Sequence, residues 1–198
     1  FAAMAADCVD VPRMAAALSF WVFTFPDVLC LNQAACVDTQ VARLLAEQRR
    51  IDTGHEKWYL HDYAVLHGRP LDRETLTQPG LLGVREASYR LVVAAMQAET
   101  DVERLALVQG LEAAGDVFFA ATEAYFARSG LAGRLRYFSG IHRDLELTHA
   151  DQMDAVLAQH YGGAVEVVRA NAMRTHVFAI FRDMMGCVQA CASPLALA

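Results

Sequence analysis

The chain has 198 residues, a formal net charge of −6 and a hydrophobic content of 55%. This length and composition predict one globular domain over residues 1–198 and exclude a disordered chain. The negative charge, without any stripe rich in Lys and Arg, argues against nucleic acid as a partner.

Apolar residues recur with a helical period along the whole chain, so the predicted elements are helices. The first covers about 11 to 34 and is bent near Pro26. Its most apolar run, residues 14–25, is shorter than a membrane span, so we expect a core helix and no membrane. The second helix covers about 39 to 66, and residues 69–83 form a loop.

The third helix covers about 84 to 98. Thr100 and Glu103 have the spacing of a capping box and begin the fourth helix, which runs to about 128. The fifth covers about 133 to 160 and the sixth about 165 to 190. The predicted fold class is therefore all-α, a single-domain bundle of six to seven helices. The five cysteines form no CxxC pair, which indicates reduced thiols in a cytoplasmic protein.

Polar side chains interrupt the apolar stripe of the fifth helix. On a helical wheel His142, Glu146 and His149 lie within about 40° of one direction, on the same face as Leu135 and Phe138. The arginines of this helix face the other way, so a solvated charge face would not group the residues like this. A buried carboxylate needs a compensating partner, and we therefore expect one for Glu146.

The second helix repeats the pattern. Asp52 and His55 lie on its core face, together with Tyr59 and Asp62. Histidines that bind a metal normally donate their other N–H to a carboxylate or carbonyl. Tyr59 and Asp62 are therefore candidates to hydrogen-bond to the ligands without binding the metal themselves.

The fourth helix is apolar on nearly all sides, which is typical of a buried helix. Glu112 and Asp116 are the acids of its apolar span, one turn apart. We predict Glu112 as a ligand. For Asp116 three roles stay open: a ligand, an acceptor behind a ligand, or a partner in helix packing.

Three carboxylates and three imidazoles thus fall on core faces of three helices: Asp52, Glu112, Glu146, His55, His142 and His149. Mixed carboxylate and imidazole ligands suit iron or manganese. Six protein ligands exceed the three, plus water, of a catalytic zinc site, and they suit two ions bridged by carboxylates. The pattern therefore predicts a two-ion site.

Two further groups have alternative interpretations. Aromatic side chains of the first helix are expected in the core, with a place in a substrate pocket as the alternative: Phe20, Trp21, Phe23 and Phe25. Basic side chains of the last helix are expected on a solvated face, with an anion site as the alternative: Arg174, His176 and Arg182.

The segments "DTGHEKWYLHD", "LVQGLEAAGD" and "HRDLELTH" resemble the heme-oxygenase-like diiron oxidases and oxygenases. Asp52 stands where that family usually has Glu, and Glu146 where it usually has Asp. The resemblance spans about 15 to 185 and implies the helical fold of the TenA/PqqC type. It also implies two iron ions held by the six residues, with O2 as co-substrate.

The activity implied by the resemblance is oxidation of a small organic substrate, often in natural-product biosynthesis. Known outcomes are C–H abstraction leading to decarboxylation or C–C cleavage, and N-oxygenation. An external electron donor and a homodimer are compatible with this expectation.

Three alternatives stay open. A ferritin-like diiron bundle would use the E-x-x-H motif of Glu146 and His149 and place His142 away from the metals. A metal-free pocket of the TenA/PqqC type would use the same acids and histidines as a hydrogen-bonded network. A helical interaction module without chemistry would expose Glu112.

Overall fold

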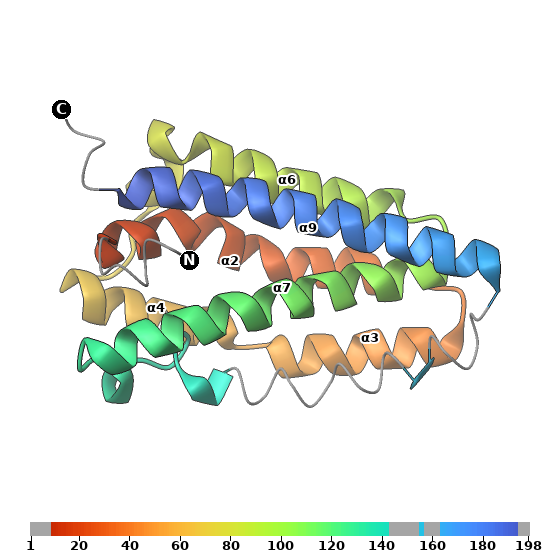
Figure 1. The fold of residues 1–198 in the computed structure, drawn as a ribbon, viewed down its shortest axis with the longest axis horizontal. Coiled ribbons are helices and arrows are strands. Elements are labelled where there is room, and N and C mark those ends of the chain that lie inside the picture. The colour runs from red at the N-terminus through yellow and green to blue at the C-terminus, as the bar shows by residue number, and fades with distance from the viewer. Residues whose placement is uncertain (1–8, 143–154, 157–162, 194–198) are drawn as a thin grey trace.

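The structure, a computed structural model, describes residues 9–142, 155–156 and 163–193 (Figure 1). Seven α-helices lie in these described residues and no strand, so the all-α prediction is confirmed there. The long helices are α2 (Val11–Ala34), α6 (Leu82–Gln97), α7 (Asp101–Arg128) and α9 (Ala164–Ala192). Of these, α2 packs on α6 and α9, and α7 packs on α9.

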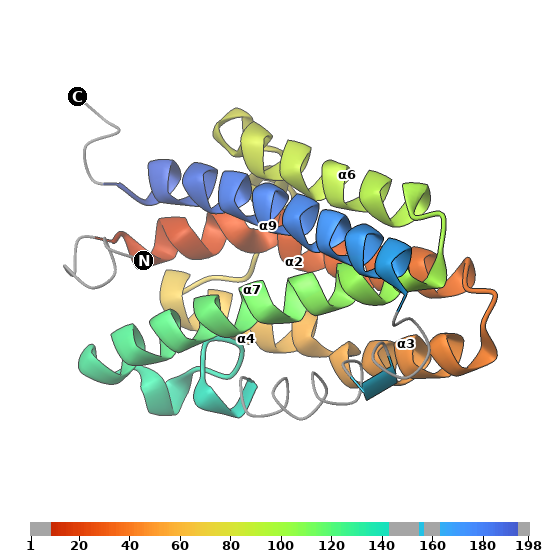
Figure 2. The same ribbon diagram turned by 45° about the vertical axis from the view of Figure 1, so that its right-hand side comes forward.

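Two shorter helices, α3 (Thr39–Asp52) and α4 (His55–His67), follow one another along α2. They lie on the side of α2 that is opposite to α6, as both views show (Figures 1 and 2). α2 is therefore the central helix of the bundle.

Side-chain caps define several helix starts. Asp10 accepts a hydrogen bond from the backbone N–H of Arg13 at the start of α2, at 3.1 Å. Asp38 accepts from the N–H of Gln40 at 2.7 Å and so begins α3. Thr100 and Glu103 form the predicted capping box of α7. These caps explain why the predicted starts of the first and fourth helices agree with the structure.

The predicted helix 39–66 is wrong as a single element, because the chain breaks between α3 and α4. Gly54 has a φ of 105°, in the left-handed region that favours glycine. The Thr53 hydroxyl donates to the carbonyl of Arg49 at 2.8 Å, and the Gly54 N–H donates to Glu56 at 3.0 Å. The Thr53 N–H keeps its own bond to the Arg49 carbonyl at 3.1 Å, so α3 ends there and the side chain of Glu56 satisfies the Gly54 N–H.

The predicted loop 69–83 is also wrong, since it contains α5 (Arg73–Thr77) and the 3₁₀ turn η1 (Pro79–Leu81). Asp72 caps α5 by accepting from the backbone N–H of Thr75 at 2.8 Å. A short capped helix has too few residues to show an apolar period, so the pattern could not reveal it.

The predicted helix 133–160 does not begin as expected. A 3₁₀ turn, η2 (Ala132–Arg134), is followed by non-helical residues 135–139, and helix resumes at Gly140. The buried carboxylate of Asp62 accepts from the N–H of Arg136 at 2.8 Å and of Phe138 at 3.0 Å. These bonds satisfy the backbone without a helix. Most of the predicted helix lies outside the described residues.

Among the described helices, α2 and α7 are long and apolar enough to cross a membrane by length and composition. We expected no membrane span because the apolar run at residues 14–25 is short, but α2 as a whole is longer than that run. In the most apolar 18-residue stretch of each helix, 50% of α2 and 67% of α7 are buried within the bundle. A buried core helix meets the same criteria, so this is weak support for a membrane protein.

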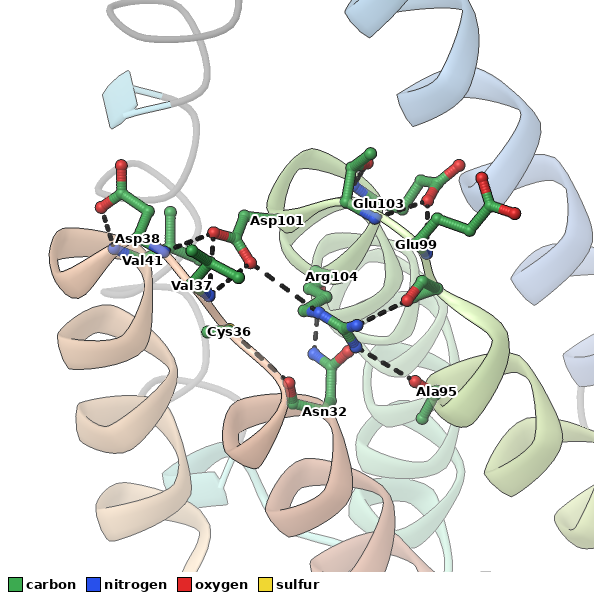
Figure 3. A network of polar contacts seen from close by, with 12 residues as sticks. Asn32, Cys36, Val37, Asp38, Val41, Ala95, Glu99, Asp101, Glu103 and Arg104 are labelled. Carbon is green, nitrogen blue, oxygen red and sulfur yellow. Dashed lines mark hydrogen bonds and ion pairs between the residues drawn. The ribbon is translucent and has the colours of Figure 1, made fainter.

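A polar network lies at the end of the bundle where α2 leads to α3 and α6 leads to α7 (Figure 3). Asp101 accepts from the backbone N–H of Val37 at 3.2 Å and of Asp38 at 2.6 Å. The buried guanidinium of Arg104 donates to two carbonyls at the end of α6, at 3.3 and 2.5 Å. Asn32 donates to the Arg104 carbonyl at 3.0 Å. The network therefore joins α2, α3, α6 and α7.

Candidate functional site

Four of the six predicted ligands line one cavity of about 70 Å³, which we call the inner cavity: Asp52, His55, Glu112 and His142. Asp52 is the last residue of α3 and His55 the first of α4, so the break at Gly54 places both at the cavity. Glu112 comes from the middle of α7, and His142 from the helical turn that begins at Gly140. Each of the four is at most 9% exposed.

One amide links the two carboxylates of this cluster. Gln48 Nε2 donates to Glu112 Oε1 at 2.8 Å and to Asp52 Oδ2 at 3.1 Å. His55 Nδ1 lies 3.4 Å from Asp52 Oδ1. The rings of His55 and His142 have centroids 4.2 Å apart. The structure thus brings these four side chains together, with Gln48 bonded to the two carboxylates.

The tautomer of His142 follows from its backbone contact. His142 Nδ1 lies 2.8 Å from the carbonyl oxygen of Tyr137. A carbonyl can only accept, so Nδ1 carries the proton and the neutral ring keeps its lone pair on Nε2. That is the form in which a histidine binds a metal or accepts a proton. Asp62 accepts hydrogen bonds from the backbone N–H groups of the residues on either side of Tyr137. It therefore holds the Tyr137 carbonyl in place, and through that carbonyl it supports His142.

The other two predicted supporting residues lie elsewhere. Tyr59 donates its hydroxyl to the carbonyl of Ala15, which ties α4 to α2. Burial raises the pKa of this phenol well above its ordinary value, so it stays protonated. Asp116 is partly buried and does not line the cavity. Tyr59 and Asp116 therefore do not line the cavity, whereas Asp62 supports the cluster indirectly.

Aromatic side chains enclose the polar cluster. Trp58 stacks on His55 with centroids 4.8 Å apart, and the Phe119 ring lies 4.1 Å from the His142 ring. Of the four aromatic residues of α2, Trp21 and Phe25 line the cavity. The remaining two do not: Phe20 packs against Tyr89 and Phe23 against Tyr59.

Gln48 is the residue that sequence reasoning missed. An uncharged amide was not counted among the candidate ligands. It lies four residues before Asp52, and this spacing places both side chains on one face of α3. A glutamine one turn before a carboxylate that is predicted to be buried was thus the signal that could have identified Gln48.

The donor set suits a metal in its chemistry, since two carboxylates and two imidazoles face a largely apolar cavity. Within the described residues no three His, Cys, Asp or Glu side chains are arranged to hold an ion. Glu146 and His149, the other two predicted ligands, lie outside the described residues. The complete ligand set therefore stays a prediction.

Comparison of the chain with protein-family models and with curated proteins finds no match.

Proposed function

We propose that the chain is a non-heme diiron oxidase or oxygenase with a heme-oxygenase-like fold, which uses O2 to oxidise a small organic substrate in specialised metabolism. The supporting observation is the convergence of Asp52, His55, Glu112 and His142 from four separate segments on one aromatic-walled cavity. Electrons would come from an external donor, and the location would be cytoplasmic.

In this proposal the four residues hold iron, and Glu146 and His149 complete the ligand set. Bound iron supplies O2 activation, which no side chain can provide. The bond of His142 Nδ1 to the Tyr137 carbonyl fixes the ring, so that Nε2 is the nitrogen that would bind the ion. The aromatic walls exclude water and present the apolar part of the substrate to the cluster.

A metal-free pocket is the second candidate, and the geometry of Gln48 favours it. Its amide already donates to both carboxylates, so the acids have a hydrogen-bond donor without a cation. In that case the chain would be a small-molecule enzyme or binding protein of the TenA/PqqC type, with His142 and its neighbours as polar contacts.

Two observations disfavour the remaining alternatives. The 4.2 Å between the rings of His55 and His142 is unlike a ferritin-like arrangement, in which His142 lies away from the metals. Glu112 is 6% exposed, whereas an interaction module without chemistry would expose it.

Anaerobic loading with ferrous iron tests the proposal. The full chain is incubated with Fe²⁺, desalted, and analysed for iron per chain. We expect about two ions in the wild type, because six ligands suit a bridged pair. His142→Ala and Glu112→Gln should each lower the iron content by at least half.

His176→Ala is the control, since His176 is exposed on α9 and does not line the cavity. It should keep wild-type iron. A wild-type chain without bound iron, or a His142→Ala variant with full iron, would support the metal-free pocket instead.

A further inference from the structure

A second and larger cavity, of about 680 Å³, lies between α7, the C-terminal half of α9 and the start of α2. Its volume is within the range of small-molecule binding sites. We call it the α7/α9 groove. Residues that carry its apolar character include Met14, Ala114, Val117, Phe178, Met185 and Val188.

The groove exists because α7 and α9 diverge. A Cβ atom on Gly110 would lie 3.1 Å from Val177 Cγ1, so the helices are in close contact at that point. Towards their C-terminal ends the two helices separate, as both views show (Figures 1 and 2). The beginning of α2, at Met14, contributes to the wall.

The charge of the groove differs from that of the inner cavity. Among the described residues that line the groove none is acidic, and Arg182 is the cation. The Arg182 guanidinium makes a 3.4 Å contact with Asp183, whose carboxylate Arg90 holds more closely at 2.9 Å. The inner cavity, in contrast, carries the acids Asp52, Glu56 and Glu112. An anionic group is therefore favoured at Arg182 and, in the iron-free chain, disfavoured beside the cluster.

The groove and the inner cavity share one wall. Phe181 lines both, and its ring lies edge-on to Trp21 with centroids 5.8 Å apart. A chain seated in the groove would therefore reach Phe181 before it reaches the acids and histidines.

We propose that the α7/α9 groove binds the aliphatic chain of an amphiphilic substrate whose anionic end lies at Arg182, and that Phe181 controls how far the chain reaches towards the cluster. The identification of this ligand as a substrate rests on the proposed function, whereas binding in the groove does not require iron. Flexible methionines and an apolar lining suit an aliphatic chain.

Gly186 provides a variant that fills the groove and keeps the fold. It lies on α9 in the groove lining, and a Cβ atom there would meet nothing within 4 Å. Leu is also a better helix former than Gly. Gly186→Leu should therefore fold with an unchanged or higher melting temperature.

The probe is 11-(dansylamino)undecanoic acid, and its fluorescence is titrated with the iron-free full chain. We expect saturable binding, with Kd raised at least tenfold by Gly186→Leu. Ala172→Leu adds the same side chain to an exposed site of α9 outside the groove, and should leave Kd unchanged. Absent probe binding, or equal Kd in the wild type and Gly186→Leu, would overturn the proposal.

Competition with dodecanoate and dodecanol tests the anionic end. Arg182→Gln should weaken dodecanoate about two- to fivefold, as expected for an exposed ion pair, and leave dodecanol unchanged. Arg43→Gln, at an exposed site of α3, is the control. An equal effect of Arg182→Gln on both ligands would contradict the placement of the charge.

Phe181→Ala tests the shared wall. Removing the ring should connect the two cavities and shift the preferred alkanoate to a longer chain, and an unchanged preference would contradict the role of Phe181. Iron content separates this inference from the proposed function. Probe binding without iron binding would refute only the proposed function, and iron binding without probe binding would refute only the groove.

Discussion

Burial controls the chemistry of Cys36, a single thiol beside the polar network at the end of the bundle. It is half-buried and donates towards the carbonyl of Asn32. Burial, together with the nearby Asp101 carboxylate, raises the pKa of this thiol to about 11. Cys30, on α2, is exposed.

Alkylation at pH 8 should therefore distinguish the two cysteines. A thiol with a pKa of 11 is about one part in a thousand thiolate at this pH, and the thiolate is the nucleophile. We expect iodoacetamide to modify Cys30 at least tenfold faster than Cys36, measured by peptide mass mapping over time. Similar rates at both cysteines would show that Cys36 is not buried in solution.

Individual site residues were predictable when their charge conflicted with an apolar face. Asp52, His55, Glu112 and His142 met this condition, and all four line the cavity. Gln48 did not, because a neutral amide does not signal that a buried charge needs a partner. Its role depends on which helix faces α3, and the sequence pattern does not contain that information.

At the scale of elements, two glycines in helices have opposite surroundings. Gly110, on α7, faces α9 so closely that a Cβ atom would lie 3.1 Å from Val177. Gly186, on α9, has open space around the same position. Gly110 is therefore needed for the packing of α7 on α9, whereas nothing around Gly186 requires a glycine there.

Alanine substitution should therefore change stability in opposite directions at the two sites. Gly186→Ala should stabilise by up to about 1 kcal/mol through helix propensity. Gly110→Ala gains the same helix propensity, but its methyl group overpacks the contact between α7 and α9, which costs about 1–3 kcal/mol. We therefore expect a net loss of stability. Urea unfolding midpoints measure both. Equal stabilisation by the two substitutions would mean that α9 shifts to accept the methyl group.

Periodicity located elements better than it located their interruptions. The bounds of α2 and α7 were predicted closely because both carry a cap and a long apolar run. The break at Gly54 and the non-helical residues 135–139 were missed. Leu135 and Phe138 are nevertheless buried, as predicted. They come from a non-helical segment whose backbone is bonded to Asp62, and not from one face of a helix.

At the scale of the whole molecule, the end of α4 is fastened to the start of α2. His67 Nε2 lies 2.8 Å from the carbonyl oxygen of Pro12, and the His67 ring stacks on Tyr63 at 4.0 Å. Burial lowers the pKa of His67 below its ordinary 6.5. The folded state thus holds this imidazole in its neutral form.

Stability should consequently decrease when the solution is acidified below about pH 6.5. In that range the unfolded chain binds a proton at His67 more readily than the folded chain does. The contribution is fully present above pH 6.5 and is lost as pH falls through the lowered pKa. His67→Gln keeps an N–H donor and does not titrate, so its urea midpoint should fall less between pH 7.5 and 5.5.

His176→Gln, at an exposed position of α9, is the control and should retain the wild-type pH dependence. If His67→Gln and the wild type lose stability equally, the imidazole is not buried against Pro12.

Fold class could be predicted from the sequence because helical period and caps are local properties. The packing partners could not, since they depend on contacts between distant segments such as α2 with α6 and α7 with α9. The single-domain organisation stays a prediction.

α2 contributes only apolar side chains to the wall of the inner cavity, among them Leu18, Trp21 and Phe25. The charged and imidazole groups all come from other segments. Mutation of α2 can therefore change the shape of this cavity without altering the acids and histidines to which we assign iron binding under the proposed function. If the proposed function holds, we expect the α2 wall to diversify among descendants of a common ancestor while the cluster is retained, so that a change of substrate would need changes in one helix only.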